Sequence, residues 1–223
     1  MDTLDFYGQP IFKLSSLEES AIGYELKLYP RDKKQWLLEE QPINLPVEQF
    51  ERLVIKTINA IPNRVSLISF DLTYEQFVNL RFRTMIATLQ TELSVRLVPE
   101  LTEHPRSPIR GSAVVSAIEA LFNADVAVCV ANVGSGNQIP GLVEALTPYV
   151  LGYKFSVQAA AGLGRNLDLM DRFSFWKNKA AANHKRFDVT GVESLDDVIY
   201  LKEQQACDLV QGPYFSHALA ITR

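Results

Sequence analysis

Three carboxylates, an amide and a lysine stand where apolar segments of the chain end. They are Glu25, Asp71, Glu100, Asn132 and Lys154. A polar side chain after an apolar run is typical of the end of a buried strand. Carboxylate and amide oxygens bind hard divalent cations, and converging carboxylates repel one another. If the fold brings these residues together, we expect the site to hold a cation or the basic group of a partner.

The apolar segments alternate with helical patterns along most of the chain. The first two, Phe6–Phe12 and Ala21–Leu28, are joined by a short polar turn, which predicts an antiparallel pair. The later predicted strands are Val65–Asp71, Val95–Leu101, Val126–Asn132, Tyr149–Ser156, Arg186–Thr190 and a short strand that ends at Val210. The predicted helices begin at Pro46 and then cover 73–91, 113–122, 142–146, 163–176 and a segment capped by Ser194.

This alternation predicts an α/β fold with a parallel sheet and right-handed crossovers. Eight strands predict a closed barrel, a modified TIM (β/α)8 barrel with an antiparallel first strand. An open, doubly wound sheet is the alternative. In a barrel the active site lies at the carboxyl ends of the strands, so the five residues above should meet at one rim with Thr190 and Gln211.

In two of the predicted helices, the spacing of the residues predicts which aromatic side chains are buried and which is exposed. The helix over 113–122 places Phe122 on its apolar side with Val114, Ile118 and Leu121. The helix over 163–176 places Met170, Phe173 and Trp176 in the core, which leaves Phe175 as an exposed contact residue.

Composition excludes several classes of protein. The chain has 223 residues, of which 47% are hydrophobic, and a net charge of −4. We therefore expect one domain over 1–223 with a sizeable core. It has no Lys/Arg run, no apolar run of about 18 residues and no signal-like start, which predicts no direct nucleic-acid binding and no membrane span. Because Cys129 and Cys207 lack metal or redox spacing, we expect reduced thiols in a cytoplasmic protein.

A series of short motifs lies at the predicted strand ends. They are Gln9-Pro10-Ile11, Gly23-Tyr24-Glu25, Phe70-Asp71-Leu72-Thr73, LVPELTE over 97–103, Val133-Gly134-Ser135-Gly136, Tyr153-Lys154-Phe155, Gly191-Val192-Glu193-Ser194 and Cys207–Gly212. Together and in this order they resemble the motifs of EAL domains, the cyclic-di-GMP phosphodiesterases. The resemblance covers residues from about 6 to 220 and implies the family's modified TIM barrel.

The resemblance implies roles for individual residues. Glu25, Asp71, Glu100 and Asn132 take the positions of metal ligands, and Lys154 and Glu193 take positions of the catalytic machinery. Gln9 and Gln211 are placed to contact the guanine edges of a bound cyclic-di-GMP.

The departures from the family pattern bear on activity. Ala131-Asn132 stands where the family has a pair of aspartates, Tyr29 replaces a phosphate-binding arginine, and Thr190 replaces a glutamate. The family reaction resembles two-metal hydrolysis, in which metals about 3.5–4 Å apart need a bridging carboxylate. Alanine offers no oxygen. We therefore expect no cofactor, or at most one weakly bound Mg²⁺ or Ca²⁺ on Glu25, Asp71, Glu100 and Asn132.

Three functions are compatible with these residues. In the first, the chain is a catalytically inactive EAL-like domain that binds a regulatory protein of bacterial transcription or motility. Its net negative charge favours a partner with a neutral or basic surface, such as a DNA-binding regulator. In the second, it is a non-hydrolysing cyclic-di-GMP receptor. In the third, it is an active phosphodiesterase with an altered metal site.

Overall fold

The computed structural model describes residues 4–17, 20–30, 45–61, 64–102, 107–135, 140–161 and 166–221. Glu103, Gly136 and Leu163, which belong to predicted motifs or helices, lie outside these ranges. The strands are β1 (Leu4–Lys13), β2 (Gly23–Pro30), β3 (Leu67–Leu72), β4 (Arg96–Thr102), β5 (Cys129–Val133), β6 (Gly152–Ser156), β7 (Arg186–Thr190), β8 (Leu209–Gln211) and β9 (Leu219–Ala220). The helices are α1 (Val47–Ala60), α2 (Tyr74–Val78), α3 (Leu80–Glu92), α4 (Gly111–Asn123), α5 (Pro140–Leu146), α6 (Val157–Ala161), α7 (Asn166–Ala182) and α8 (Leu195–Glu203), with 3-10 turns η1 (Leu14–Ser16) and η2 (Thr147–Tyr149).

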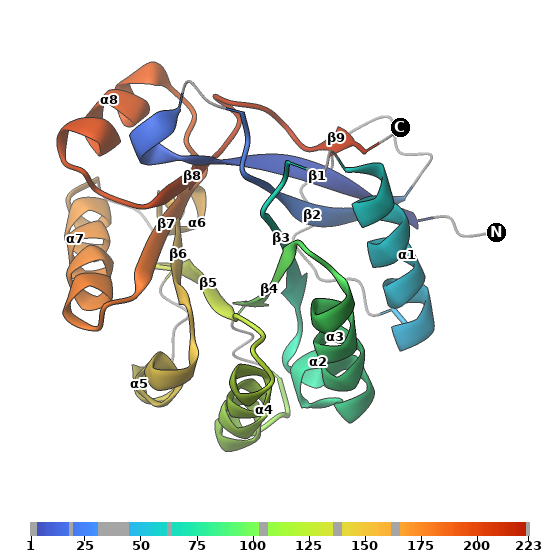
Figure 1. Ribbon diagram of the computed structural model, residues 1–223. Coiled ribbons are helices and arrows are strands. Elements are labelled where there is room, and N and C mark those ends of the chain that lie inside the picture. The colour runs from blue at the N-terminus through green and yellow to red at the C-terminus, as the bar shows by residue number, and fades with distance from the viewer. Residues whose placement is uncertain are drawn as a thin grey trace.

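The strands form a closed barrel. Their order is β2-β3-β4-β5-β6-β7-β8-β1, and β1 also pairs with β2, which closes the ring. Strands β2 to β8 are parallel, whereas β1 is antiparallel to both of its barrel neighbours. Figure 1 shows the ring with the helices arranged around it. The predicted barrel with an antiparallel first strand is confirmed, and the open sheet is excluded.

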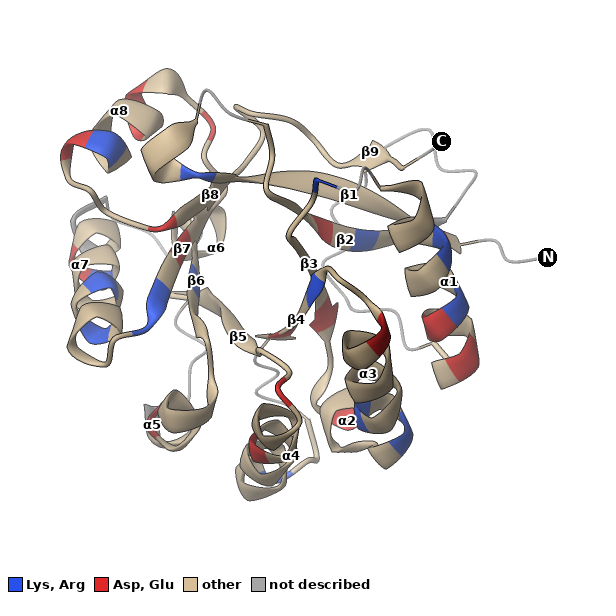
Figure 2. Cartoon of the chain, viewed as in Figure 1, with Lys and Arg blue, Asp and Glu red and all other residues tan. Residues whose placement is uncertain are grey.

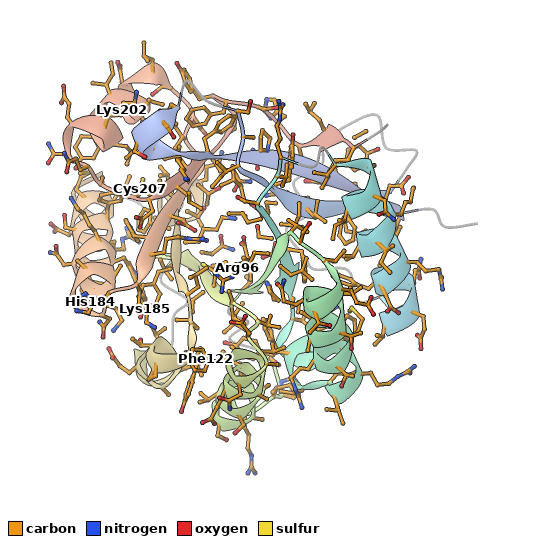
Figure 3. The ribbon with its side chains drawn as sticks, viewed as in Figure 1. Arg96, Phe122, His184, Lys185, Lys202 and Cys207 are labelled. Atoms are coloured by element: carbon orange, nitrogen blue, oxygen red, sulfur yellow. The ribbon has the colours of Figure 1, made fainter. Side chains whose placement is uncertain are left out.

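Alternation along the strands separates an outer apolar layer from a more polar interior. In β3, Ile68, Phe70 and Leu72 are fully buried beneath the helices, and the Phe70 ring lies 5.4 Å from that of Phe50 on α1. Ser69 and Asp71 alternate with them and point into the barrel. Side chains fill the interior of the ring (Figure 3). The same alternation in every strand supplies the residues of the rim.

Several predicted boundaries differ from the structure. The helix predicted over 73–91 is broken at Asn79, whose backbone is extended and whose Oδ1 accepts a hydrogen bond from the Arg81 amide (2.9 Å). Asparagine competes in this way with the helical backbone, so it ends α2 and caps α3. Strand β5 begins at Cys129 instead of Val126, and β6 begins at Gly152 because η2 occupies 147–149. Helix α6 and strand β9 were not predicted.

Three predictions for aromatic residues are confirmed, and two predictions of burial are wrong. Phe173 and Trp176 are buried and Phe175 is 60% exposed, as expected. Phe122 is 52% exposed and Met170 is 41% exposed. The buried stripe of α4 runs along 114, 117, 118 and 121, and the next residue is rotated about 100° away from it. Phe122 instead lies between α4 and α5, with its ring 5.9 Å from that of Tyr149 (Figure 3).

Charge is distributed over the outer helices with both signs, and charged residues also lie on the strands, as on β2 (Figure 2). Within the described ranges, no helix has the length and apolar character needed to cross a membrane.

Candidate functional site

The strand register brings the predicted rim residues together. Gln9 is the pairing partner of Glu25, Asp71 is that of Glu100, and Thr190 is that of Gln211. Because these residues occupy inward positions of neighbouring strands, their side chains converge inside the closed barrel. Of the predicted metal ligands and catalytic residues, Glu25, Glu100 and Lys154 are directly joined.

The Lys154 ammonium lies between two carboxylates. Its Nζ donates to Glu25 Oε2 at 2.7 Å and to Glu100 Oε1 and Oε2 at 2.9 and 3.0 Å. All three side chains are buried. Charge-assisted hydrogen bonds therefore hold the ammonium between the two carboxylates, with both oxygens of Glu100 within hydrogen-bond distance.

Two glutamines extend the network. Gln211 Nε2 donates to Glu25 Oε2 at 2.7 Å and to Gln9 Oε1 at 2.9 Å, and Gln9 Nε2 donates to the Ser216 carbonyl at 3.1 Å. Both glutamines are buried. The amide groups proposed for guanine recognition therefore hold the barrel interior together, and Glu25 Oε2 accepts two hydrogen bonds.

A second basic residue, Lys27, also reaches the rim. Its Nζ lies 3.4 Å from Glu25 Oε1. The sequence interpretation missed Lys27. Lys27 follows Glu25 by two residues in β2, so strand alternation places both side chains on the same face. The remaining carboxylate of the rim, Asp71, accepts a hydrogen bond from Thr102 Oγ1 at 2.9 Å.

Burial and charge set the protonation of the cluster. Burial raises the pKa of Glu25, but attraction to Lys154 and Lys27 outweighs it and lowers this pKa to about 2. Burial raises the pKa of Glu100 to about 7. Attraction to Lys154 offsets the effect of burial only in part, and the charges of Glu25 and Asp71 repel a negative charge on Glu100. Burial lowers the pKa of Lys154, but Glu100 and Glu25 raise it further, above its usual range. The Lys154 ammonium therefore stays charged, and the pKa of Glu100 is raised into the neutral range.

The other predicted residues lie in different surroundings. Asn132 has a left-handed backbone (φ 53°) at an irregularity in the β5–β6 pairing, a conformation that asparagine tolerates. Ala131 beside it is buried. The Glu193 carboxylate is exposed and accepts from Gln158 Nε2 at 2.6 Å, apart from the buried Lys154 cluster.

The rim does not fit a two-metal centre. Among the described residues, no group of three or more His, Cys, Asp or Glu side chains is arranged to hold a metal ion. Glu25 and Glu100, the strongest candidate ligands, already share the Lys154 ammonium. A divalent ion would have to displace that lysine before it could bind both carboxylates.

No family model and no curated protein matches this chain. Several solved structures match it over almost its full length. The structure described as "PaMucR Phosphodiesterase, c-di-GMP complex" has a TM-score of 0.74 and 17% identity, and the match covers 97% of both chains. The EAL domain of Mycobacterium smegmatis DcpA has a TM-score of 0.70 and 18% identity, with 97% of this chain and 92% of that chain covered.

The Bacillus subtilis YkuI protein, with an EAL domain and in complex with its substrate c-di-GMP and calcium, has a TM-score of 0.76 and 15% identity. The match covers all of this chain but 56% of that one. At these identities the similarity establishes the fold: the chain is an EAL-like barrel.

Proposed function

We propose that this EAL-like barrel is a catalytically inactive domain, spanning 1–223, that regulates another protein by binding it. The observation that carries the proposed loss of catalysis is Ala131, which offers no oxygen where the family resemblance places a bridging carboxylate. Lys154 Nζ, within 3.0 Å of both Glu25 and Glu100, adds a competitor for the carboxylates that remain. These are the carboxylates that the family resemblance assigns to metal. An ammonium group neutralises them without supplying the Lewis acid that phosphodiester hydrolysis needs.

The missing oxygen at position 131 bears directly on the metal pair. Two cations about 3.5–4 Å apart need a bridging carboxylate, and β5 offers the methyl group of Ala131 followed by the neutral amide of Asn132. Each 1.36 kcal/mol of lost transition-state stabilisation lowers the rate tenfold. Loss of a metal pair that supplies several kcal/mol therefore reduces turnover by orders of magnitude.

We also propose that the rim takes at most one divalent ion, and takes it weakly. Glu25, Asp71, Glu100 and Asn132 are the oxygen donors available, and Lys154 competes with the ion for two of them.

A hydrolysis assay tests the proposed inactivity. Purified protein is incubated with cyclic-di-GMP and Mg²⁺ or Mn²⁺, with an active EAL phosphodiesterase as the positive control. We expect no linear dinucleotide. Turnover near the ordinary enzyme rate of about 10 per second would instead establish an active phosphodiesterase with an altered metal site.

The outer surface over α8 supports a protein-binding role. Leu195 and Ile199 are 54% and 43% exposed one turn apart, and Tyr200 beside them lies against α7 through the Phe173 ring (6.4 Å). We call Leu195, Ile199 and Tyr200 the α8 surface. Its acidic neighbours, Glu193, Asp196, Asp197 and Glu203, outnumber the single lysine of this segment, Lys202. An apolar patch with an acidic border favours a partner with a basic surface, such as a DNA-binding regulator of transcription or motility.

Affinity capture from a bacterial lysate, with and without cyclic-di-GMP, tests this role. We expect a stoichiometric protein partner in both conditions. Failure to recover a partner in either condition would overturn the regulator proposal, and recovery only with the nucleotide would favour the receptor function.

The alternative is a non-hydrolysing cyclic-di-GMP receptor. It is favoured by the retention of Gln9 and Gln211 in a fold whose neighbours include cyclic-di-GMP complexes. Against it, both amides are engaged inside the barrel, and Gln211 cannot turn towards a ligand without releasing Glu25. Calorimetric titration with cyclic-di-GMP, with Mg²⁺ or Ca²⁺ present, decides between the two, because a receptor must bind.

A further inference from the structure

A small cavity lies inside the barrel next to the Lys154 cluster. Its volume is about 10 Å³, and polar residues on its wall include Ser69, Glu100, Lys154, Asp188 and Gln211. Apolar residues on the same wall, Ile11, Leu67 and Leu209, pack together as a separate cluster. The cavity therefore has a polar part facing the rim network and an apolar part facing away from it.

Three buried polar atoms around this cavity have no hydrogen-bond partner among the described residues. They are Ser69 Oγ, Asp188 Oδ1 and Gln211 Oε1. All three side chains are more than nine-tenths buried. The other atoms of the two larger groups are engaged, because Asp188 Oδ2 accepts from Arg186 Nε and Nη2 (2.9 and 2.7 Å) and Gln211 Nε2 donates to Gln9 and Glu25. Leaving a buried polar atom unpaired costs about 1–3 kcal/mol, so native interiors rarely do so.

We propose that this cavity is a binding site for one internal water molecule. A volume of about 10–15 Å³ accommodates one water, and buried waters make about three hydrogen bonds. Water donates to Asp188 Oδ1 and Gln211 Oε1 and accepts from the Ser69 hydroxyl, which satisfies all three atoms.

The charges of the wall favour a neutral ligand over a cation. Two acidic residues, Glu100 and Asp188, are matched by two basic residues, Lys154 and Arg186. Each acid is hydrogen-bonded to one of these bases. The Ser69 hydroxyl can donate a hydrogen bond to a water molecule in this cavity.

The water positions a group of the rim. Gln211 holds Glu25 through its Nε2, and the water fixes the opposite end of the same amide. It also connects the Arg186–Asp188 pair of β7 to the Lys154 cluster. This role is independent of whether the domain binds a protein or a nucleotide.

A crystal structure of the full chain at about 1.5 Å resolution tests the site. We expect one electron-density peak in the cavity, with contacts of about 2.6–3.2 Å to Ser69, Asp188 and Gln211. A cavity without a peak would overturn the proposal. So would a peak with contacts of about 2.3–2.5 Å, which would identify a cation.

A pair of variants tests the site in solution. Ser69→Ala keeps the space and both acceptors, whereas Ser69→Val fills the cavity with a methyl group. Magnetic relaxation dispersion of water nuclei should detect one fewer long-lived water in Ser69→Val than in the wild type, and no change in Ser69→Ala. Equal counts in the wild type and a folded Ser69→Val would contradict the proposal, and the wild-type crystal structure decides it if Ser69→Val does not fold.

Discussion

At the residue scale, Lys154 supplies inside the chain the positive charge that the rim carboxylates require. A buried ion pair gives little net stability when intact, because desolvation offsets attraction, but removing one partner leaves an uncompensated charge. Glu25 depends on this lysine most, since its lowered pKa keeps it ionised at all ordinary pH values. We therefore expect the lysine that competes with a metal ion for these carboxylates also to stabilise the fold.

We expect Lys154→Met to lower the free energy of unfolding by about 3–5 kcal/mol. Millimolar Mn²⁺ should recover part of this loss in the variant and have little effect on the wild type, because the freed carboxylates can then bind the ion. Thermal unfolding with and without Mn²⁺ measures both effects. Lys56→Met, which removes an exposed partner of Asp5, is the control and should cost at most about 1 kcal/mol. Equal Mn²⁺ stabilisation of wild type and Lys154→Met would contradict the competition between lysine and metal.

The raised pKa of Glu100 predicts that the stability of the fold depends on pH. Its pKa is about 7 in the folded protein and 4.5 as the ordinary value of the unfolded chain. Between these values the folded state holds one more proton, so Glu100 lowers stability as the pH rises from 4.5 to 7. Glu25, with a folded pKa of about 2, acts in the opposite direction and only below pH 4.5.

Glu100→Gln should therefore flatten the decline of the unfolding temperature between pH 5 and 7. The control Glu193→Gln, at an exposed carboxylate, should keep the wild-type slope. Thermal unfolding followed by circular dichroism across this pH range measures the slopes. An unchanged slope in Glu100→Gln would show that Glu100 does not titrate there.

Much of the rim could be predicted from the sequence, because its residues end apolar runs in a recognisable order. Glu25, Glu100 and Lys154 were expected to converge, and they do. Lys27 and Asp188 were missed, since each lies within a strand where only period-two alternation marks it as inward-facing. The contact of one ammonium with two carboxylates could not be predicted, because it depends on side-chain conformations and on the register of strands far apart in sequence.

At the element scale, the succession of strands and helices was predictable and their ends were not. Apolar periodicity predicted the bounds of β7, those of β4 within one residue and those of β3 within two. The break at Asn79 depends on one side chain accepting from the Arg81 amide, a local competition that periodicity does not report. The late start of β6 depends on the 3-10 turn around Pro148.

The turn after β5 gives a prediction at this scale. Gly134 has φ +88°, and a Cβ there would lie 2.3 Å from the Phe155 ring. Gly134→Ala should therefore destabilise the fold by more than about 2 kcal/mol, through backbone strain and overpacking. Gly141→Ala in α5 is the matched control, because a Cβ there meets nothing within 4 Å, and it should stabilise by up to about 1 kcal/mol. Urea denaturation of both variants measures the difference, and similar stabilities would refute the steric argument.

At the scale of the whole molecule, closure of the ring by β1 separates the interior of the barrel from the outer surface formed by the helices. The interior is occupied by the ion network and the apolar cluster, so the protein partner that we propose would bind the outer helices (Figure 1). Leu80 on α3 is 66% exposed and Phe122 on α4 is 52% exposed, each on its own helix. On α8, by contrast, exposed apolar residues fall one turn apart and are bordered by acidic residues.

This contrast is the reason that we propose the α8 surface as the partner-binding surface. Ile199→Lys places a positive charge at the centre of the α8 surface, where it repels a basic partner and removes an apolar contact. We expect at least tenfold weaker binding of the captured partner by calorimetry, a loss of about 1.4 kcal/mol. Leu80→Lys introduces the same charge at an exposed leucine on α3 and should bind as the wild type does. Because the partner is expected to be basic, wild-type affinity should also fall as salt is raised. Unchanged binding by a folded Ile199→Lys, or loss of binding in Leu80→Lys alone, would place the interface elsewhere on the barrel.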